Sequence, residues 1–231
     1  MASSKRLSDF RAKIDQVIQD DANVLSAGER DAATQEAVYR YSLDKPDITY
    51  YDFSGTGSAQ GWALPSTWVT DFSQIEGIEY PSGERPPDYL ELDDYYVYPP
   101  SGSQRLELKW ETPSSSETVR MAFTIPHVVS DTSNTIPDSD YDAVCNLAAA
   151  MCCRWLANRY TQTTDSTLSA DVVSYRTKGD MYASRAKDLL TMYKEHMGIT
   201  EAGAVAASSQ REWDTTYQWG SDFIWHPKRW R

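Results

Sequence analysis

The period of the hydrophobic pattern changes twice along the chain, and this change limits the fold more than any other feature of the sequence. Before residue 46, and again after residue 131, apolar residues recur every three or four positions, as in amphipathic helices. Between Ile48 and Ile125 they recur at every second position, as in half-buried strands. The sequence therefore predicts an α+β protein, with a helical bundle as body, an inserted small antiparallel β-module and an extended C-terminal tail.

Two helices are expected in the first 46 residues. The near-3.6-residue period predicts the first over residues 5–25. Ser26 and Glu29 form a Ser-x-x-Glu capping box, in which each side chain satisfies a free backbone donor, and so begin the second. It should end near Leu43, because Pro46 stops it. Its predicted inner face consists of Ala33, Ala37, Val38 and Tyr41.

The β-module is expected to contain two clear strands near its C-terminal end. Every second side chain is apolar in residues 105–111 and in residues 119–125. Residues 113–116 between them have the polar composition of a short hairpin loop. Earlier strands are predicted in stretches rich in aromatic and β-branched side chains, at residues 48–53, 68–80 and 89–98.

Helical periodicity returns in the last third of the chain. A continuous stripe runs from Tyr141 to Arg159, and residues 137–140 supply candidate N-caps for it. A last long helix is expected from about Ser169, with Gly198 suited to end it. The predicted divisions are N-terminal helices (1–46), the inserted β-module (47–130), C-terminal helices (131–198) and an aromatic, basic docking tail (199–231).

The composition of the tail differs from that of the body. Residues 211–231 carry six aromatic side chains without any supporting Leu, Val or Met, so this segment cannot form a core of its own. Trp, Tyr and Arg dominate interface hot spots, and a linker-like stretch precedes the segment. We expect it to dock onto another subunit rather than to fold back over its own helices. The candidate partner-binding residues are Trp213, Tyr217, Trp219, Phe223, Trp225, Lys228, Arg229, Trp230 and Arg231.

Charge argues against nucleic acid as the primary ligand. The formal net charge is -12, and residues 44–117 alone hold 14 acids against four bases. We also expect a soluble protein without a signal peptide, because the longest apolar run, residues 147–153, is far too short to span a bilayer. Cys145, Cys152 and Cys153 are expected to stay unbridged in a reducing compartment, with no zinc site.

The motifs typical of catalysis or metal binding are incomplete. Asp138-x-Asp140-x-Asp142 opens like a calcium loop, but its next position is Ala143 rather than glycine, which favours helix capping. The glycines of residues 55–61 lack the Gly-Lys-Ser/Thr of a phosphate loop. His127 and His196 are interpreted as ordinary boundary residues. No catalytic, cofactor or metal site is predicted.

Three stretches of the sequence carry a resemblance to a known family. They are the helix of residues 26–42 that closes before Pro46, residues 136–160, and, after a polar break, the helix containing residues 178–190. In pattern and order they resemble the head-to-tail adaptor (head-completion or neck connector) proteins of tailed bacteriophages. The likeness covers most of the chain in layout but is specific only in these helices.

The resemblance implies a structural virion protein, not an enzyme, that is assembled in the host cytoplasm. It implies a ring, commonly of twelve copies, beneath the portal and linked to tail or neck proteins, with the C-terminal tail reaching into the portal and genomic DNA passing non-specifically through the channel. Two alternatives stay open. The Tyr- and Trp-rich module is also typical of carbohydrate-binding or host-surface modules, and the acids Glu91, Asp93 and Asp94 are candidates for an enzyme.

Overall fold

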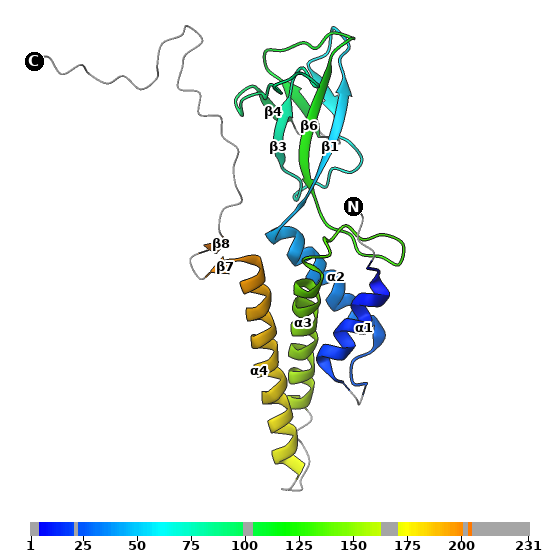
Figure 1. Ribbon diagram of the computed structural model, residues 1–231, viewed down its shortest axis with the longest axis vertical. Coiled ribbons are helices and arrows are strands. Elements are labelled where there is room, and N and C mark those ends of the chain that lie inside the picture. Colours follow the sequence, from blue (N-terminus) through cyan, green and yellow to red (C-terminus); the bar gives the residue numbers. More distant parts are fainter. Residues whose placement is uncertain (1–4, 21–22, 99–103, 163–170, 201–202, 205–231) are drawn as a thin grey trace, which may run out of the picture.

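The structure, a computed structural model, describes residues 5–20, 23–98, 104–162, 171–200 and 203–204. In these residues four helices form an elongated body, and the β-module lies at one end of it (Figure 1). The predicted α+β class is confirmed. The helices are α1 (Leu7–Ile18), α2 (Ala27–Asp44), α3 (Tyr141–Gln162) and α4 (Asp171–Met197). The strands are β1 (Asp47–Ser54), β2 (Gly61–Ala63), β3 (Ile75–Glu79), β4 (Tyr95–Tyr98), β5 (Arg105–Leu108), β6 (Thr118–Ile125), β7 (Ile199–Thr200) and β8 (Gly203–Ala204).

Helix α1 is shorter than the hydrophobic period predicts. It ends at Ile18, where Gln19 adopts a left-handed conformation with φ of 54°. The backbone N–H of Leu25 donates to the Asp20 carboxylate at 2.9 Å and so closes the connection to α2. Leu25 is fully buried in the helical core although it is not helical. The hydrophobic period of the sequence therefore extends past the end of the helix, because Leu25 is apolar for burial in the core and not as part of the helix.

Helix α2 begins as the sequence predicts. The N–H of Ser26 donates to Glu29 Oε2 at 2.8 Å, and the N–H of Glu29 donates to Ser26 Oγ at 3.3 Å, which completes the capping box. The helix ends at Asp44, two residues before Pro46. Its predicted inner face is confirmed, since Ala33, Ala37, Val38 and Tyr41 are all buried.

Helix α3 is the central element of the body and packs against α1, α2 and α4. Because it is covered on several sides, its buried residues do not form a single narrow stripe. The helix α4 approaches it closely at Gly179, where an added Cβ would lie 3.2 Å from Thr161 Cγ2. The buried positions of α3 are Ala143, Val144, Cys145, Leu147, Ala148, Ala149, Ala150, Cys152, Cys153, Leu156 and Ala157.

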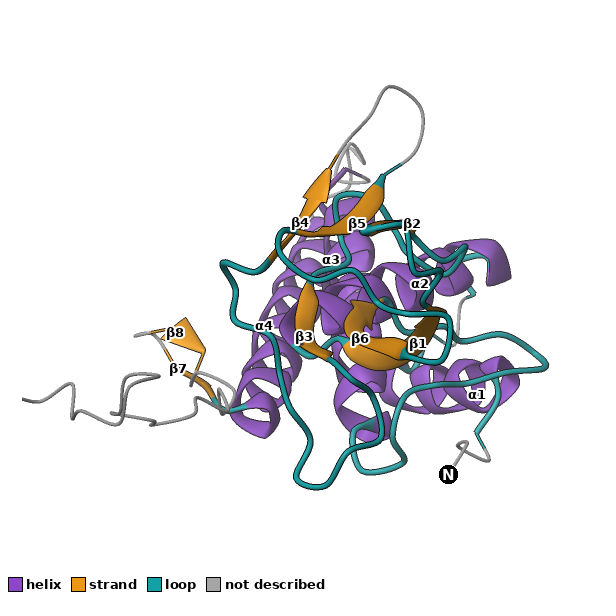
Figure 2. Ribbon diagram, turned by 90° about the horizontal axis from the view of Figure 1, so that it is seen from above, coloured by secondary structure: helices purple, strands orange, loops and turns teal. Residues whose placement is uncertain are grey.

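The β-module consists of two three-stranded antiparallel sheets, ordered β1-β6-β3 and β2-β5-β4. Seen from above, the two sheets lie face to face over the helices (Figure 2). The module has its own hydrophobic core between the sheets, separate from that of the bundle. Its fully buried members are Ile78, Leu106, Val119, Met121 and Phe123.

The predicted hairpin between residues 105–111 and 119–125 is wrong. β5 and β6 belong to different sheets, and the chain between them crosses from one sheet to the other. Gly57 N–H donates to the Pro113 carbonyl at 2.8 Å, and a Cβ on Gly55 would lie 2.0 Å from the Ser114 oxygen. Residues 113–114 therefore pack against the glycine segment 55–57. Residues 114–117 do form a turn, in which Glu117 N–H donates to the Ser114 carbonyl at 3.0 Å, but this turn does not join two paired strands.

Of the three earlier strands, β1 (Asp47–Ser54) agrees with the prediction, and the other two are shorter than predicted. Only Ile75–Glu79 of the 68–80 stretch and Tyr95–Tyr98 of the 89–98 stretch form strands. Trp68 lies in a turn, where its indole N–H donates to Gln104 Oε1 at 2.8 Å and its ring packs on Phe123. Strand β2 begins at Gly61, the last glycine of the segment that was interpreted as a turn. A stretch rich in aromatic side chains thus proved to contain a partly buried connection as well as a strand.

The end of α4 agrees with the prediction. Gly198 has a φ of +68° directly after the helix, as a C′ glycine requires. The two-residue strands β7 and β8 follow and pair with each other. Among the described helices none is both long and apolar enough to cross a membrane.

Candidate interaction sites

All of the predicted partner-binding residues, from Trp213 to Arg231, lie outside the described residues. They are Trp213, Tyr217, Trp219, Phe223, Trp225, Lys228, Arg229, Trp230 and Arg231. Their role therefore stays a prediction. The described part of the chain offers a polar junction between bundle and module, two hollows and an exposed sheet edge.

The junction is organised around the carboxylate of Asp140, at the start of α3. Tyr41 O–H and Lys45 Nζ donate to its Oδ2 at 2.5 and 2.7 Å. His196 Nε2 donates to its Oδ1 at 3.0 Å. Tyr41 and Lys45 come from the end of α2 and the connection to β1, and His196 comes from the last turn of α4. One buried carboxylate thus joins three helices at the base of the module.

Two further contacts strengthen the junction. Tyr193 O–H donates to Asp44 Oδ2 at 2.7 Å, which ties α4 to the end of α2 a second time. His127, in the chain that returns from β6, is buried and donates from Nε2 to the Lys45 carbonyl at 3.1 Å. Its ring also packs on that of Tyr41. His196 and His127 do lie at the ends of elements, as predicted, and in addition their rings make contacts that the sequence did not reveal.

Ionisation of the junction follows from its contacts. Burial alone would raise the pKa of Asp140, but the hydrogen bonds from Lys45, Tyr41 and His196 outweigh burial and lower it well below the usual range. Burial and the bond to Asp140 raise the pKa of Tyr41. Burial lowers the pKa of His127, which favours a neutral ring. Asp140 is therefore a permanently charged acceptor at neutral pH.

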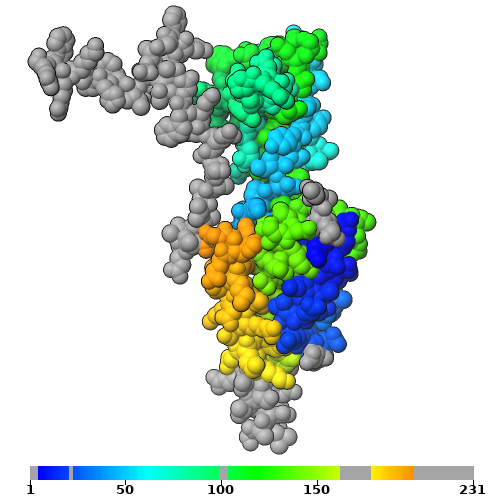
Figure 3. Space-filling view, in the orientation of Figure 1, coloured from blue at the N-terminus to red at the C-terminus, as the bar shows by residue number. Residues whose placement is uncertain are grey.

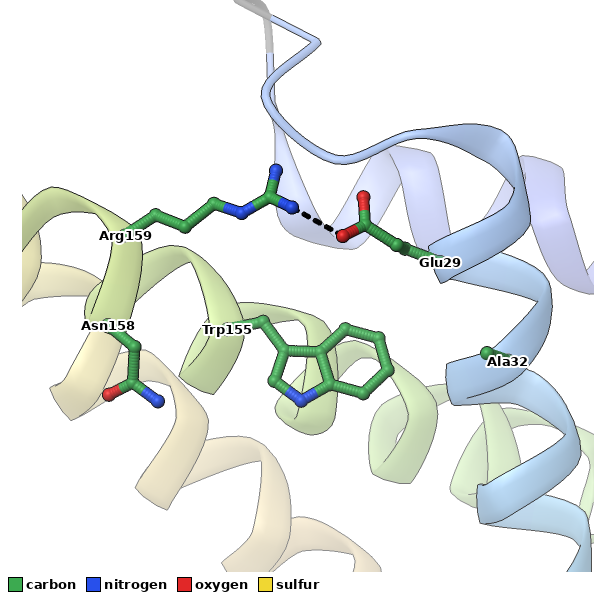
Figure 4. Close-up of a pocket in the computed structure, with 5 residues that line it drawn as sticks. All are labelled: Glu29, Ala32, Trp155, Asn158 and Arg159. Carbon is green, nitrogen blue, oxygen red and sulfur yellow. Dashed lines mark hydrogen bonds and ion pairs between the residues drawn. The ribbon is translucent and has the colours of Figure 1, made fainter.

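A hollow of about 430 Å³ lies between α2 and α3 (Figure 4). The indole of Trp155 forms one wall, and an ion pair between Arg159 and Glu29 crosses above it. The same guanidinium donates to the Val24 carbonyl, so it ties the α1–α2 connection to α3. The hollow is wide open, and the two charged groups in its lining, Glu29 and Arg159, already pair with each other, which is typical of a helix-packing groove.

A second hollow, of about 380 Å³, lies on the outer face of the β1-β6-β3 sheet. Arg120 on β6 pairs with Asp52 on β1 at 2.8 Å and with Glu79 on β3 at 3.6 Å. Hydrogen bonding to Arg120 lowers the pKa of Asp52. Tyr50 lies beside this charged row and is 66% exposed. The outer face therefore combines an exposed aromatic ring with a fixed row of charges.

The acids of the enzyme alternative lie in a turn. Glu91 N–H donates to Asp94 Oδ2 at 3.1 Å, and Asp94 N–H donates to the Glu91 carbonyl at 3.0 Å. The Lys109 N–H donates to the Asp94 carbonyl at 2.8 Å, so the turn fixes the end of β5. Asp94 therefore stabilises this turn and its contact with the chain after β5. Within the described ranges, no group of three or more His, Cys, Asp and Glu side chains is placed to hold a metal ion.

The three cysteines are free and buried in α3. Burial raises the pKa of Cys145 and of Cys152 to about 12, and that of Cys153 to about 11. Such thiols are poor nucleophiles at neutral pH. They serve as small apolar side chains of the core.

The carbohydrate alternative needs aromatic rings on the surface of the module. Tyr50 and Tyr89 lie on the outer face of the β1-β6-β3 sheet, and Tyr96 and Tyr98 lie on that of the other sheet. Each of the four is exposed. The alternative stays a prediction.

Comparison with known proteins gives only distant likenesses. No family model matches the chain, and no curated protein matches it. Among solved structures, the chain is similar to the neck of an empty GTA particle computed with C6 symmetry, with a TM-score of 0.29, 11% identity, and coverage of 64% of this chain and 81% of that chain. It is also similar to the neck of the native GTA particle computed with C12 symmetry, with a TM-score of 0.28, 14% identity, and coverage of 78% and 94% respectively.

A third structure with a similar score is the virion of the native gene transfer agent (GTA) particle. Its TM-score is 0.28 and its identity 12%, with coverage of 73% of this chain and 87% of that chain. TM-scores of this size do not establish a common fold.

The junction was not predicted from the sequence. Asp140 was assigned a capping task, and its carbonyl does accept the N–H of Val144 at 3.0 Å. Its carboxylate, however, binds residues that lie about a hundred positions earlier and more than fifty later in the chain. No local pattern signals such a contact, because its partners are brought together only by the packing of α2, α3 and α4.

Proposed function

We propose that this protein is a head-to-tail adaptor of a tailed bacteriophage. Copies of it form a ring beneath the portal and link the portal to tail or neck proteins. The resemblance to the adaptor family implies about twelve copies in this ring. Genomic DNA passes through the ring. The role is structural and involves no catalysis, cofactor or metal.

The observation that carries the proposal is the anchored end of α4. His196 and Tyr193 fix the last turns of this helix to Asp140 and Asp44, at the base of the module. The chain then continues into the aromatic and basic residues 211–231. A docking segment that starts from a fixed point loses less freedom on binding than one that starts from a loose end. This arrangement suits a tail that reaches a neighbouring protein.

The charge of the module supports the second part of the proposal. Residues 44–117 hold 14 acids and four bases. A module with this excess of negative charge repels the phosphates of DNA, so DNA slides past it without binding. The last four residues, with Lys228, Arg229 and Arg231, instead suit acidic groups on the portal.

The test is association of the full chain with portal-bearing capsids that lack their neck. We expect the full-length protein to co-sediment with these capsids, and a variant without residues 211–231 to remain in the supernatant. Trp225→Ala should weaken association, because a buried tryptophan is a frequent hot spot. Trp110→Ala is the matched control, since Trp110 is 76% exposed on the module. Normal co-sedimentation of the truncated protein contradicts the proposal.

A further inference from the structure

The two edges of the β1-β6-β3 sheet are not equivalent. The edge of β3 is closed by the chain itself, because Leu90 N–H donates to the Ile78 carbonyl at 2.8 Å and Tyr80 N–H donates to the Asp88 carbonyl at 3.0 Å. Among the described strands, β1 pairs with β6 alone. Within the described residues, no hydrogen bond reaches the outer side of Tyr50, Tyr51 or Asp52. The edge of β1 is therefore open over its central part.

The sequence of β1 lacks most of the features that protect open edges, since its charged residues are only Asp47 at its start and Asp52, which pairs with Arg120 of the same sheet. Natural edge strands avoid pairing through Pro, Lys, bulges or short length. Strand β1 is eight residues long, pairs with β6 in regular register, and reads Asp-Ile-Thr-Tyr-Tyr-Asp-Phe-Ser. Ile48 is 50% exposed and Tyr50 is 66% exposed on it. An exposed strand of β-forming residues is suited to accept a further strand.

The open edge and the end of the described chain lie on opposite flanks of the molecule. In Figures 1 and 2, α4, β7 and β8 lie on the side of β3, whereas β1 lies on the side of α1. The space-filling view likewise shows α4 on one flank of the body and α1 on the other (Figure 3). In a head-to-tail ring two different surfaces of the chain meet, and we take the contact to join the α4 flank of one copy to the β1 flank of the next. The chain that leaves α4 then starts next to a neighbour's open edge.

The chain beyond Ala204 contains a segment with the chemistry that this edge requires. Residues 215–219, Thr-Thr-Tyr-Gln-Trp, consist mainly of β-formers and contain no Pro, Gly or charged side chain. The ten residues 205–214 span up to about 35 Å when extended, enough to cross to an adjacent copy. Pairing between two modules is disfavoured by their negative charge, whereas residues 205–231 hold four bases against three acids.

We propose that residues 215–219 of one copy add as a strand to the open edge of β1 in the neighbouring copy. The backbone of the added strand pairs with the outer side of residues 50–52, and its side chains lie over the exposed face that carries Tyr50. Residues 223–231 remain available for the portal. The inference rests on the ring of the proposed function, but it assigns the contact between neighbours rather than the contact with the portal.

The test uses cysteine pairs in the full-length protein and a short bis-maleimide, which tolerates some uncertainty in register. One chain carries Tyr50→Cys and a second, mass-tagged chain carries Tyr217→Cys. The native thiols are buried and do not compete. The matched control replaces Tyr50→Cys by Tyr96→Cys, on an exposed tyrosine of the other sheet. Both mixtures are treated with and without portal rings, and association with the rings is measured on the same samples.

We expect the heterodimer from the 50/217 pair to exceed that from the 96/217 pair by on the order of tenfold, because docking raises the effective concentration of the two thiols. Equal yields of heterodimer from the 50/217 and 96/217 pairs overturn the proposal. Absence of the 50/217 heterodimer both with and without portal rings also overturns it. A third sample, a single chain that carries both Tyr50→Cys and Tyr217→Cys, is treated in the same way. Cross-linking within this chain, without heterodimer in the 50/217 mixture, would mean that the tail covers its own module and also overturns the proposal. Cross-linked neighbours that fail to bind portal rings would refute the proposed function and leave the strand addition standing.

Discussion

His196, in the last turn of α4, donates a hydrogen bond of 3.0 Å to Asp140, the residue that precedes α3. The same carboxylate binds Tyr41 and Lys45, beside the point where the chain enters the module. The end of the last helix and the base of the module are therefore held by one group.

Replacement of Asp140 should destabilise the protein. Asp140→Asn leaves the donors Tyr41 and Lys45 without their charged acceptor, and we expect a loss of about 2 to 4 kcal/mol in the free energy of unfolding. Urea denaturation measures it. Asp142→Asn is the control, because Asp142 is 70% exposed in its pair with Lys13 and should cost less than about 0.5 kcal/mol. Equal effects of the two substitutions would refute the role of Asp140.

The contribution of Asp140 should depend on pH in one direction. Its pKa is lowered in the folded state, so folding favours the carboxylate, and this stabilisation is complete above the ordinary aspartate pKa of about 3.9. It declines as the pH falls below that value. The difference in unfolding free energy between wild type and Asp140→Asn should therefore shrink below about pH 4. A difference that grows on acidification would contradict this assignment.

The cysteines should resist thiol reagents while the protein is folded. Burial raises the pKa of Cys145 and Cys152 to about 12, so almost no thiolate exists at pH 8. With Ellman's reagent we expect no fast reaction of the native protein, and full reaction of all three thiols in denaturant. Rapid labelling of the native protein would show that α3 is accessible.

Two glycines should respond oppositely to alanine. At Gly55 an added Cβ would lie 2.0 Å from the Ser114 carbonyl oxygen, so Gly55→Ala should cost about 1 to 3 kcal/mol. At Gly28, in α2, no atom lies within 4 Å of the added Cβ, and Gly28→Ala should stabilise by up to about 1 kcal/mol. Thermal unfolding compares the two. A neutral Gly55→Ala would mean that residues 113–114 move freely away.

Loss of the α4 anchor should weaken portal association without removing the tail. His196→Ala deletes the donor to Asp140, and we expect the dissociation constant to rise about three- to tenfold, as for one lost hydrogen bond of about 1 kcal/mol. His196→Gln keeps a hydrogen-bond donor, so its dissociation constant should lie between those of wild type and His196→Ala. If His196→Ala binds portal rings like wild type, the anchor has no part in docking.

The sequence predicted the helices better than the sheets, for a physical reason. Capping is local, so Ser26 and Glu29 were sufficient to place the start of α2. Alternation along residues 105–108 and 118–125 showed which side chains are buried, but it contains no information on which strands pair. The end of α1 was missed because Leu25 is buried in the same core as the helix without being part of it.

The candidate sites divide in the same way. The aromatic and basic character of residues 211–231 is visible in the composition alone. The junction is not, because Tyr41, Asp140 and His196 meet only after three helices have packed. The open edge of β1 also depends on topology: β3 is covered by residues 88–90, and β1 has no second neighbour among the described strands.

The central claim is that this protein is an adaptor that assembles on a portal. The most direct measurement is negative-stain microscopy of the purified full-length protein mixed with portal rings of the same phage. The account predicts an added ring of density at one end of the portal, absent from samples of the variant without residues 211–231. Bare portal rings beside free protein, at concentrations where both are soluble, would contradict it.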